Sequence, residues 1–390
     1  MDLFLATCPE QTKHVLVEEL KSLGAREVSP GYKLVSFKAD KELYYELHLK
    51  LATASNLYTV LRDCSAKNPK MLYSQARRIK WSEIFALHKT FKVDGIAGDR
   101  GPDAMSSNEI SKQVRAAIEN HFHECEGKKP KVDLKEPNIL ITCMVYRGRA
   151  NICVNTSGKA LHKRAYRAGG HPAPLKETMA ASLLRIAGFK GQTTFLDPMC
   201  GSGTIAIEAA FLALEKACNI HRKKGQFGLE QLRSFDRNLW RSVQQKLRDA
   251  KKQAVDNKIY ACDLNPQFVS AAKENALRAR VEKYIDFQAK SFFELSKPEE
   301  SGVLIANLPY GERLDVDGES LESFYRKIGD HLKKNFSSWQ AYLFVNEESP
   351  WKHMGLKPSR KIPLLNGSIK TKLLVYDLYR GSKKIKHKGV

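Results

Sequence analysis

The glycine loop at residues 197–204 (DPMCGSGT) joins an apolar segment to a helical one, and this junction constrains the fold more than any other part of the sequence. Gly201 and Gly203 allow the backbone to turn sharply and to approach a ligand closely. The free amides at the start of the following helix favour a polar or anionic group. The junction therefore predicts a βα unit with a ligand site at the carboxyl end of its strand.

Apolar, β-rich segments alternate with helical ones beyond residue 174. The expected strand and helix pairs are 193–196 with 204–218, 258–262 with 266–278, and 302–306 with 321–335. Such alternation predicts βαβ units and a mostly parallel, doubly wound sheet. Two further strands are expected at 340–346 and 370–379, and the second should pair antiparallel at the sheet edge.

The first half of the chain is typical of mixed α and β structure. We expect helices at 12–23, 41–51 and 107–122, and strands at 32–38, 90–93, 138–146 and 150–155. The last two strands flank Arg147-Gly148-Arg149, as the arms of a hairpin would. This order favours small α+β units over one large sheet.

The chain is strongly basic, with 65 Lys and Arg against 43 Asp and Glu in 390 residues and a formal net charge of +22. Residues 1–170 carry +9 of this charge and residues 171–390 carry +13. A positive surplus favours a polyanionic partner, because each neutralised phosphate releases condensed counterions, although it can also serve only solubility. Charge alone does not separate these two interpretations.

No apolar run approaches the roughly 18 residues of a membrane span, and the first residues do not resemble a signal peptide. We therefore expect a cytoplasmic protein with no membrane partner, and the sequence shows no sign of an obligatory protein partner.

The eight cysteines are scattered without a Cys-x-x-Cys pair. This spacing predicts buried, reduced thiols and no metal site.

Two stretches stand out by composition. Residues 159–174 combine Lys and Arg with Gly and Pro and contain no acid, which predicts an inter-domain junction. Residues 215–258 carry 12 basic and 5 acidic side chains, with Phe227, Phe235 and Trp240 among them. Either these aromatics pin a solvated excursion to its domain, or the stretch forms a basic surface near a nucleic-acid path.

Asp263 follows the second expected strand of the alternating half, within the sequence YACDLNP at 260–266. A carboxylate at a strand tip suits the two hydroxyls of a ribose. This does not identify the cofactor, because residues 201–206 also fit the dinucleotide pattern G-x-G-x-x-G/A.

The sequence Asn307-Leu308-Pro309-Tyr310 follows the third expected strand. The Asn307 amide oxygen and the Leu308 carbonyl can accept the two N–H bonds of an exocyclic amine, and the Tyr310 ring can stack on the base. Pro309 favours an extended Leu308, which fixes the direction of that carbonyl. An amine held in line with a sulfonium methyl needs no strong base, but its nucleobase must be extruded or single-stranded.

These motifs, together with residues 151–167 and 173–181, resemble in order the Rossmann-type, S-adenosylmethionine-dependent methyltransferases that carry an N-terminal THUMP RNA-binding domain. Among them, the sequence is most similar to the bacterial large-subunit ribosomal RNA guanine-N2 methyltransferases. The resemblance covers nearly the whole chain. It implies an α/β class I methyltransferase domain at 173–382, with a doubly wound, mostly parallel sheet and an antiparallel edge strand. Ahead of it the resemblance implies a ferredoxin-like module at 1–55, a THUMP domain at 56–158 and a basic linker at 159–172, and after it a basic tail at 383–390.

The resemblance also implies roles for individual residues. The S-adenosylmethionine cofactor is expected to contact Asp197, Met199, Cys200, Gly201, Gly203, Thr204, Asp263, Leu264, Ser291 and Asn307. The target base is expected to contact Asn307, Leu308, Pro309 and Tyr310. Ribosomal RNA is expected to contact Lys163, Arg164, Tyr166, Arg167 and Arg313.

The sequence departs from the family pattern at three of these places. Ser291 stands where relatives usually have an Asp that contacts the cofactor adenine, so a weaker contact is expected. Leu308 replaces the commoner Pro and leaves the backbone acceptor intact. Ala165 replaces a common Gly, so a positive φ is not expected there. Some relatives carry a second methyltransferase module at the C-terminus, for which 390 residues leave no room, so one reaction per chain is expected.

Other interpretations remain open. The amine-holding motif also serves N6-adenine methylation of RNA or DNA, and an RNA-binding assembly factor with a vestigial cofactor site is a non-catalytic alternative. A nicotinamide oxidoreductase would leave residues 307–311 unexplained. Cys200 is expected to be a packed thiol and not a nucleophile. Arg77, Arg78, Lys80 and Trp81 fit an RNA contact patch and an ordinary surface equally well.

Overall fold

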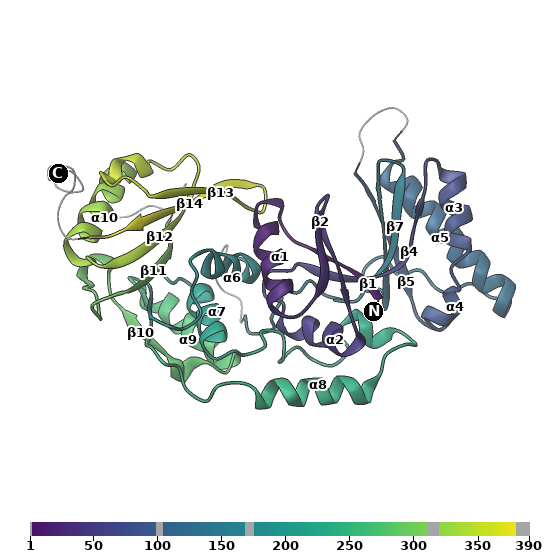
Figure 1. Cartoon of the computed structure of the whole chain (residues 1–390), viewed down its shortest axis with the longest axis horizontal. Coiled ribbons are helices and arrows are strands. Elements are labelled where there is room, and N and C mark those ends of the chain that lie inside the picture. The colour runs from purple at the N-terminus through teal and green to yellow at the C-terminus, as the bar shows by residue number, and fades with distance from the viewer. Residues whose placement is uncertain (1, 99–103, 168–174, 310–319, 380–390) are drawn as a thin grey trace. The chain divides into compact units, whose positions relative to one another are not determined.

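The computed structural model describes residues 2–98, 104–167, 175–309 and 320–379 (Figure 1). The chain forms two compact units. The first consists of Met1–Cys8, Leu16–Leu161 and Arg222–Lys246, and the second of Pro9–Val15, His162–His221 and Leu247–Val390. Residues 222–246 thus belong with the N-terminal half of the chain, although they lie within the stretch 173–382 that the sequence assigned to a single catalytic domain.

One seven-stranded sheet runs through the first unit, in the order β2-β3-β1-β4-β7-β6-β5. Its strands are β1 (Asp2–Thr7), β2 (Arg26–Gly31), β3 (Leu34–Ala39), β4 (Asn56–Ser65), β5 (Phe91–Ala97), β6 (Ile139–Tyr146) and β7 (Arg149–Asn155). The expectation of small separate units was wrong in this respect, and the reason is β4. Its first residues pair with β1, from Asn56 opposite Thr7 to Thr59 opposite Phe4, while the stretch from Tyr58 to Ser65 pairs with β7.

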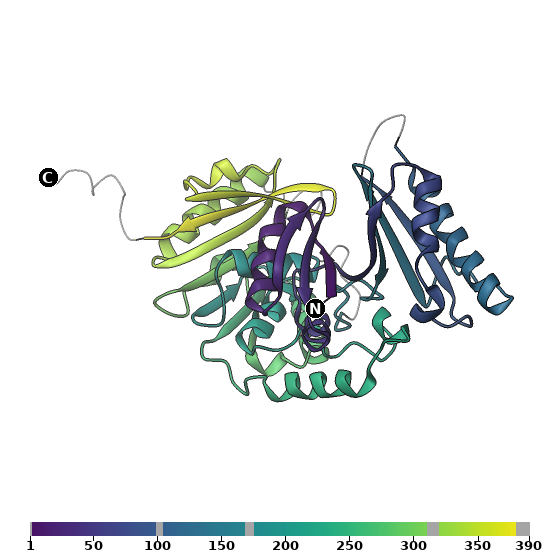
Figure 2. The same ribbon diagram turned by 45° about the vertical axis from the view of Figure 1, so that its right-hand side comes forward.

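The helices of the first unit are α1 (Lys13–Ser22), whose first three residues are assigned to the second unit, α2 (Lys41–Lys50), α3 (Pro69–Arg77), α4 (Trp81–Ile84) and α5 (Ser107–Glu126). The expected helices at 12–23, 41–51 and 107–122 are confirmed, and local signals explain their ends. The Asp40 side chain caps α2 by accepting a hydrogen bond from the Leu43 amide at 2.8 Å. Ser106 and Glu109 form a capping box at the start of α5. Helices α3 and α5 pack against each other, and α5 packs on β5 (Figures 1 and 2).

The basic excursion within residues 215–258 contains α8 (Arg237–Asp249). Its aromatic side chains do pin it, but to the first unit and not to the domain of its flanking segments. The buried Trp240 ring meets Tyr45 of α2 edge-on, with 5.4 Å between the ring centroids, and Phe227 meets His48 at 6.0 Å. The Asp236 amide donates a hydrogen bond to the Tyr45 hydroxyl at 2.9 Å.

A second seven-stranded sheet lies in the second unit, in the order β10-β9-β8-β11-β12-β14-β13. Its strands are β8 (Thr194–Asp197), β9 (Ile259–Asp263), β10 (Ile285–Ala289), β11 (Gly302–Asn307), β12 (Trp339–Asn346), β13 (Arg360–Asn366) and β14 (Ile369–Asp377). The helices are α6 (Glu177–Ile186), α7 (Thr204–Ala213), α9 (Pro266–Arg278) and α10 (Leu321–Asn335).

Strands β10, β9, β8, β11 and β12 are parallel, and β14 pairs antiparallel with β12. The mostly parallel sheet is therefore confirmed. The antiparallel strand β14 is not at the edge, because β13, which the sequence did not suggest, covers its outer side. The chain order reverses between β8 and β11, and ligands of such sheets bind at the carboxyl ends of the strands beside this reversal.

Among the residues that the structure describes, no helix is long and apolar enough to cross a lipid bilayer.

Candidate functional site

Three polar side chains lie at the carboxyl ends of adjacent parallel strands. Asp197 ends β8, Asp263 ends β9 and Asn307 ends β11, and β8 lies between the other two. Parallel strands bring their carboxyl ends to one edge of the sheet. The structure thus gathers at one edge the three motifs that are far apart in sequence.

The glycine loop is tied to the tip of β9 by backbone hydrogen bonds. The Gly201 amide donates to Asp263 Oδ2 at 2.9 Å, and the Asn265 amide donates to Oδ1 at 3.0 Å. Gly203 has a φ of 78°, and a Cβ added there would lie 2.9 Å from the Ala272 Cβ of α9. Only glycine combines this conformation with this close approach. The loop therefore packs directly against α9.

Asp197 is fully buried, and neither of its carboxylate oxygens has a hydrogen-bond partner among the described residues. Burial raises the pKa of Asp197 well above its usual range, and the nearby Asp263 adds to the shift. The backbone amides of Met199 and Ala206 lie near enough to oppose the shift in part, but neither forms a hydrogen bond of good geometry with the carboxylate. A buried acceptor without a donor is costly. A cationic or N–H-bearing ligand at this edge would remove that cost.

Asn307 also keeps a buried side-chain oxygen, Oδ1, without a partner in the described part of the chain. The residues that follow it are anchored. The Leu308 amide donates to the Phe344 carbonyl of β12 at 3.0 Å, and the Pro309 carbonyl accepts from the Tyr325 hydroxyl at 3.5 Å. Tyr310 and Arg313, both named by the sequence motif, lie outside the described residues.

The remaining residues assigned to the cofactor differ in their surroundings. The Cys200 thiol is buried, and burial, with Asp197 and Asp263 nearby, raises its pKa well above the usual range, which suits a packing role. The Leu264 side chain is 67% exposed. The Ser291 hydroxyl already caps a short helix by accepting a hydrogen bond from the Phe293 amide at 3.3 Å.

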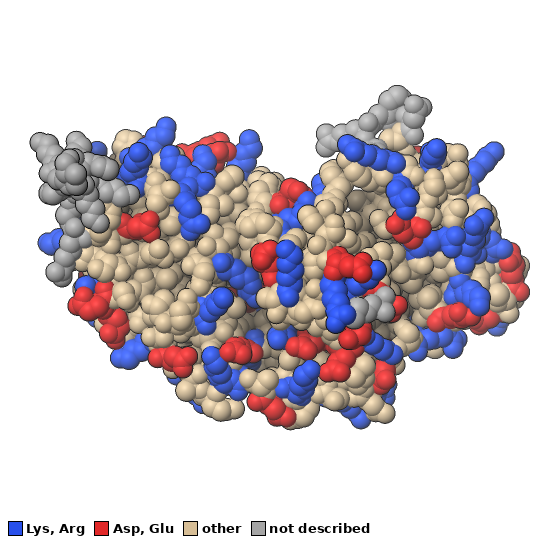
Figure 3. Space-filling model, viewed as in Figure 1, with Lys and Arg blue, Asp and Glu red and all other residues tan. Residues whose placement is uncertain are grey.

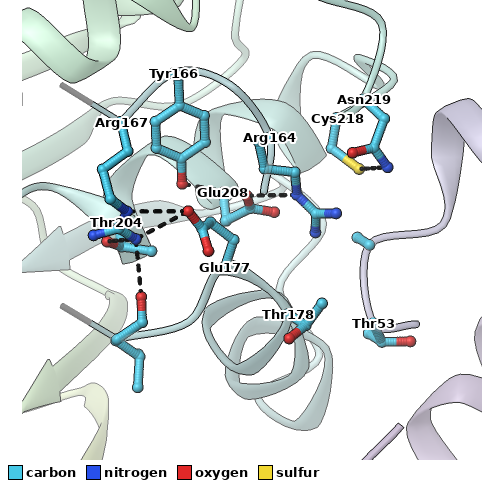
Figure 4. A network of polar contacts seen from close by, with 12 residues as sticks. Thr53, Arg164, Tyr166, Arg167, Glu177, Thr178, Thr204, Glu208, Cys218 and Asn219 are labelled. Carbon is cyan, nitrogen blue, oxygen red and sulfur yellow. Dashed lines mark hydrogen bonds and ion pairs between the residues drawn. The ribbon is translucent and has the colours of Figure 1, made fainter. Parts of the chain in front are cut away.

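Arg164 and Tyr166 of the linker point into the protein, so the expectation that they contact RNA was wrong. The Arg164 side chain is 0% exposed and its Nε lies 3.3 Å from Glu208 Oε1, while the Tyr166 hydroxyl lies 3.5 Å from the same oxygen (Figure 4). Burial alone would lower the Arg164 pKa, but Cys218, Glu208 and Glu177 raise it overall, so the guanidinium stays charged. Lys163 is exposed and stays a predicted RNA contact.

A buried acid explains why this basic stretch turns inward. Glu208 is 1% exposed in α7, whose sequence TIAIEAAFLA is otherwise apolar, and a buried carboxylate needs a cation. Ala165 has a φ of 69°, contrary to expectation, and its neighbours Arg164 and Tyr166 are both buried. Their anchoring holds Ala165 in this strained conformation.

Arg167 braces the glycine loop and is only partly exposed. Its guanidinium donates to Glu177 Oε1 at 3.0 and 3.2 Å and to the Leu175 carbonyl at 3.1 Å. The same group reaches Ser202 Oγ at 3.4 Å and Thr204 Oγ1 at 3.3 Å (Figure 4). Glu177 was missed as a site residue, although a lone acid in the apolar helix α6 (ETMAASLLRI) is a recognisable signal.

Two of the four residues suggested as an RNA contact patch, Arg77 and Trp81, have partners within the protein. Trp81 is fully buried and donates its indole N–H to the Ala76 carbonyl at 3.0 Å. Arg77 pairs with Glu124 at 2.7 Å. In the part of the chain that the structure describes, no group of three or more His, Cys, Asp or Glu residues is placed to hold a metal ion.

Comparison with known proteins places these observations in a family. Residues 164–374 match the model of the RMKL-like methyltransferase domain, residues 66–155 match the THUMP domain, and residues 3–57 match the RlmL ferredoxin-like domain. A Synechocystis sp. protein, named as a candidate RNA methyltransferase, is 32% identical over 96% of this chain and 97% of its own length.

The ribosomal RNA large subunit methyltransferase K/L of Shewanella frigidimarina is 31% identical over 97% of this chain, and this chain spans 53% of that relative's length. Among solved structures, the methyltransferase SMU.472 complexed with SAH superposes with a TM-score of 0.85 at 24% identity, covering 98% of this chain and 99% of that one. The Rossmann-like fold and the resemblance found in the sequence are both confirmed. The chain belongs to the RMKL-like methyltransferase family and carries that domain together with a THUMP domain and an RlmL-type ferredoxin-like domain.

Proposed function

We propose that this protein transfers the methyl group of S-adenosylmethionine to the exocyclic N2 of a guanine in large-subunit ribosomal RNA. The observation that carries this proposal is the pair of partnerless buried acceptors, Asp197 and Asn307, on one edge of the sheet beside the glycine loop. One acceptor suits the cofactor and the other suits the target amine.

The residues at this edge fit S-adenosylmethionine. The Asp197 carboxylate suits the ammonium group of the methionine part, because a cation would lower the raised pKa and stabilise the charged acid. Each Asp263 oxygen accepts one backbone amide and retains a second lone pair for a ribose hydroxyl. The cofactor supplies an electrophilic methyl on a sulfonium. The solved relative SMU.472 carries SAH, the demethylated form of this cofactor.

The Asn307 motif fits an exocyclic amine. The Asn307 Oδ1 and the Leu308 carbonyl accept its two hydrogens, which leaves the nitrogen lone pair directed at the methyl. Hydrogen bonds to Phe344 and from Tyr325 fix the backbone on either side of Leu308, so the two acceptors are held in place before the base arrives. The amine then loses its proton to water after transfer.

RNA is supported as the substrate by the THUMP domain and by the names of the relatives. The K/L relatives are ribosomal RNA large subunit methyltransferases, and the Synechocystis relative is named for RNA. The net charge of +22 agrees with a polyanionic substrate. On the face shown in Figure 3, Lys and Arg side chains are spread widely, with acidic side chains between them.

The test compares Asn307→Ala with Asn346→Ala, using large-subunit ribosomal RNA from cells that lack this protein. Asn346 also ends a strand of the same sheet, but its side chain already accepts the Glu348 amide at 3.0 Å. We expect Asn307→Ala to slow methyl transfer by roughly 10²- to 10³-fold, as loss of one preorganised hydrogen-bonding group does. Cofactor affinity should stay within a factor of about two, and Asn346→Ala should transfer normally.

Analysis of the methylated nucleosides tests the choice of base. N2-methylguanosine is expected. N6-methyladenosine as the product would show that the motif holds adenine instead, and normal turnover in Asn307→Ala would remove Asn307 from the mechanism. Failure of the unaltered protein to bind S-adenosylmethionine in calorimetry would favour a non-catalytic RNA-binding role.

A further inference from the structure

A group of basic side chains lies at the amino-terminal edge of the second sheet, opposite the edge that carries Asp197, Asp263 and Asn307. We call it the amino-edge cluster, and it consists of Lys216, His221, Arg248, Lys251, Arg280 and Lys283 around Tyr284. All of these residues belong to the second unit.

The connections of the sheet fix this location. Helices α7 and α9 start at the carboxyl edge and return to the opposite edge, so Lys216 and Arg280, which follow them, lie there. The stretch 215–258 also ends at this edge. Its residue Asn257 donates a hydrogen bond from Nδ2 to the carbonyl of Gly191 at 3.1 Å, and Gly191 lies just before β8. The cluster is thus built from three chain segments that meet at the starts of β8, β9 and β10.

The charges in the cluster are not neutralised within the described residues. Lys216 Nζ donates to the carbonyls of Ala279 and Arg280, which accept a hydrogen bond but carry no negative charge. The ammonium groups of Lys251 and Lys283 lie 5.2 and 4.9 Å from the centre of the Tyr284 ring. The five Lys and Arg side chains of the cluster form no ion pair with any residue that the structure describes.

Three acids near the cluster are already paired with cations that do not belong to it. Glu215 and Asp256 both pair with Lys252, at 3.0 and 3.9 Å. Arg278, at the end of α9, pairs with Glu274 at 2.6 Å. Lys252 and Arg278 therefore have acidic partners within the protein, whereas the Lys and Arg side chains of the cluster have none among the described residues.

Mutual repulsion is visible in the buried members of the cluster. Burial, followed by the charges of Lys251 and Arg280, lowers the pKa of Lys216 to about 7. Burial, followed by the charges of Lys216, Arg280 and Arg248, lowers the pKa of His221 to about 4. Positive potential of this kind attracts phosphate groups and releases the counterions condensed on them.

We infer that the amino-edge cluster binds phosphates of the RNA substrate, at a contact separate from the methyl-transfer edge. This inference rests on the proposed function for the identity of the polyanion. It also combines the two interpretations of residues 215–258. The aromatic middle of the stretch packs on the first unit, whereas its two flanks, around Lys216 and Arg248, supply cations to the phosphate contact.

The test is the salt dependence of binding to protein-free large-subunit ribosomal RNA. The variant carries Arg248→Gln and Lys283→Gln, both at exposed positions outside the core. The matched control is Arg278→Gln, which removes one charge from the same surface, but a charge that Glu274 already neutralises. Each lost phosphate contact lowers the slope of log K against log salt by roughly 0.7 to 0.9. We therefore expect the double variant to lose about 1.4 to 1.8 of this slope and the control to lose much less.

Catalytic parameters distinguish this contact from the active site. The KM for RNA should rise in the double variant, while kcat and the affinity for S-adenosylmethionine stay unchanged. An unchanged salt slope in a double variant that melts at the normal temperature would overturn the inference and leave the proposed function standing. If the unaltered protein neither binds nor methylates this RNA, the proposed function itself is wrong, and the inference falls with it.

Discussion

Arg167 shows how one side chain can support a site without touching a ligand. Its guanidinium joins the linker to α6 through Glu177 and to the glycine loop through Ser202 and Thr204. The conformation of the glycine loop, which we propose holds the cofactor, therefore depends on a residue that the sequence assigned to RNA. We propose that Arg167 is a positioning residue of the cofactor site.

Replacing Arg167 should weaken cofactor binding. Arg167→Gln removes the ion pair and most of the donors to the loop, and hydrogen bonds to charged groups are worth about 1.5 to 3 kcal/mol each. Because the side chain is partly exposed, we expect a smaller effect, about tenfold in the Kd of S-adenosylmethionine. Calorimetric titration with the cofactor measures it.

Lys163→Gln is the matched control for Arg167→Gln, since Lys163 is exposed in the same linker. Cofactor affinity should be unchanged in this control. Arg167→Lys should recover part of the loss, because a lysine keeps the charge opposite Glu177 but cannot reach both loop hydroxyls. Equal cofactor affinity in all three variants would show that the loop keeps its shape without Arg167.

Candidate site residues could be predicted from the sequence where each one follows an apolar strand. Asp197, Asp263 and Asn307 each follow an apolar strand, and parallel strands must bring these positions to one edge. Arg164 and Tyr166 were misassigned, because the stretch KRAYR does not reveal that Glu208, 44 residues beyond Arg164, is buried beneath it. Burial of a charge depends on a distant partner, which local composition does not report.

Two elements, β4 and α8, connect parts of the chain that were expected to be separate. The ten residues of β4 pair with β1 and with β7, so two small modules share a sheet. Helix α8 packs by Trp240 against Tyr45 of α2 and against Phe227, which in turn meets His48 of α2. The cohesion of the first unit therefore depends on a segment that is over 80 residues further along the chain than β7.

Trp240→Ala should release α8 from the first unit. Truncating a buried Trp costs about 3 to 5 kcal/mol, and Trp240 is 5% exposed against Tyr45, Phe227 and Phe235. Hydrogen exchange should show faster exchange of amides in α8 and α2, while amides in β8 and β11 keep their protection. Ser242→Ala, at an exposed position of the same helix, is the control. Unchanged exchange in α8 would mean that Trp240 does not anchor it.

The elements that were predicted are those with local signals. Helices α2, α9 and α10 begin at the caps Asp40, Asn265 and Ser320, and their apolar spacing is regular. Five strands (β1, β2, β4, β10 and β13) were not predicted, because their existence depends on partners elsewhere in the sheets. Helix α7 was expected to reach residue 218 but ends at Ala213. Two residues further on, Glu215 has a positive φ of 52°, which does not fit a continuing helix.

The stability of the whole molecule should depend on pH through the buried His48. Burial lowers the pKa of His48 to about 3, and its Nδ1 donates to the Tyr44 carbonyl at 2.8 Å. The unfolded chain binds a proton at this residue below about pH 6.5 and the folded protein does not. Stability is therefore full above pH 6.5 and falls as the pH decreases toward 3, by about 2 kcal/mol between pH 8 and pH 5.

Urea unfolding at pH 8 and pH 5 measures this loss. Other histidines with lowered pKa, among them His162, His221 and His331, act in the same direction, so the comparison needs a variant. His48→Gln keeps a donor for the Tyr44 carbonyl and has no proton to gain. The variant should be less stable at pH 8, yet lose about 2 kcal/mol less than the unaltered protein between the two pH values. An equal loss in both would assign the pH dependence to other groups.

The threading of the chain through its two units limits how this protein can be divided. Pro9–Val15 belongs to the second unit, and Arg222–Lys246 belongs to the first. No single cut separates the two units, because a fragment beginning at His162 would carry Phe227 and Trp240 without Tyr45 and His48. We therefore expect the two units of such a chain to fold together and to respond together to changes in either one.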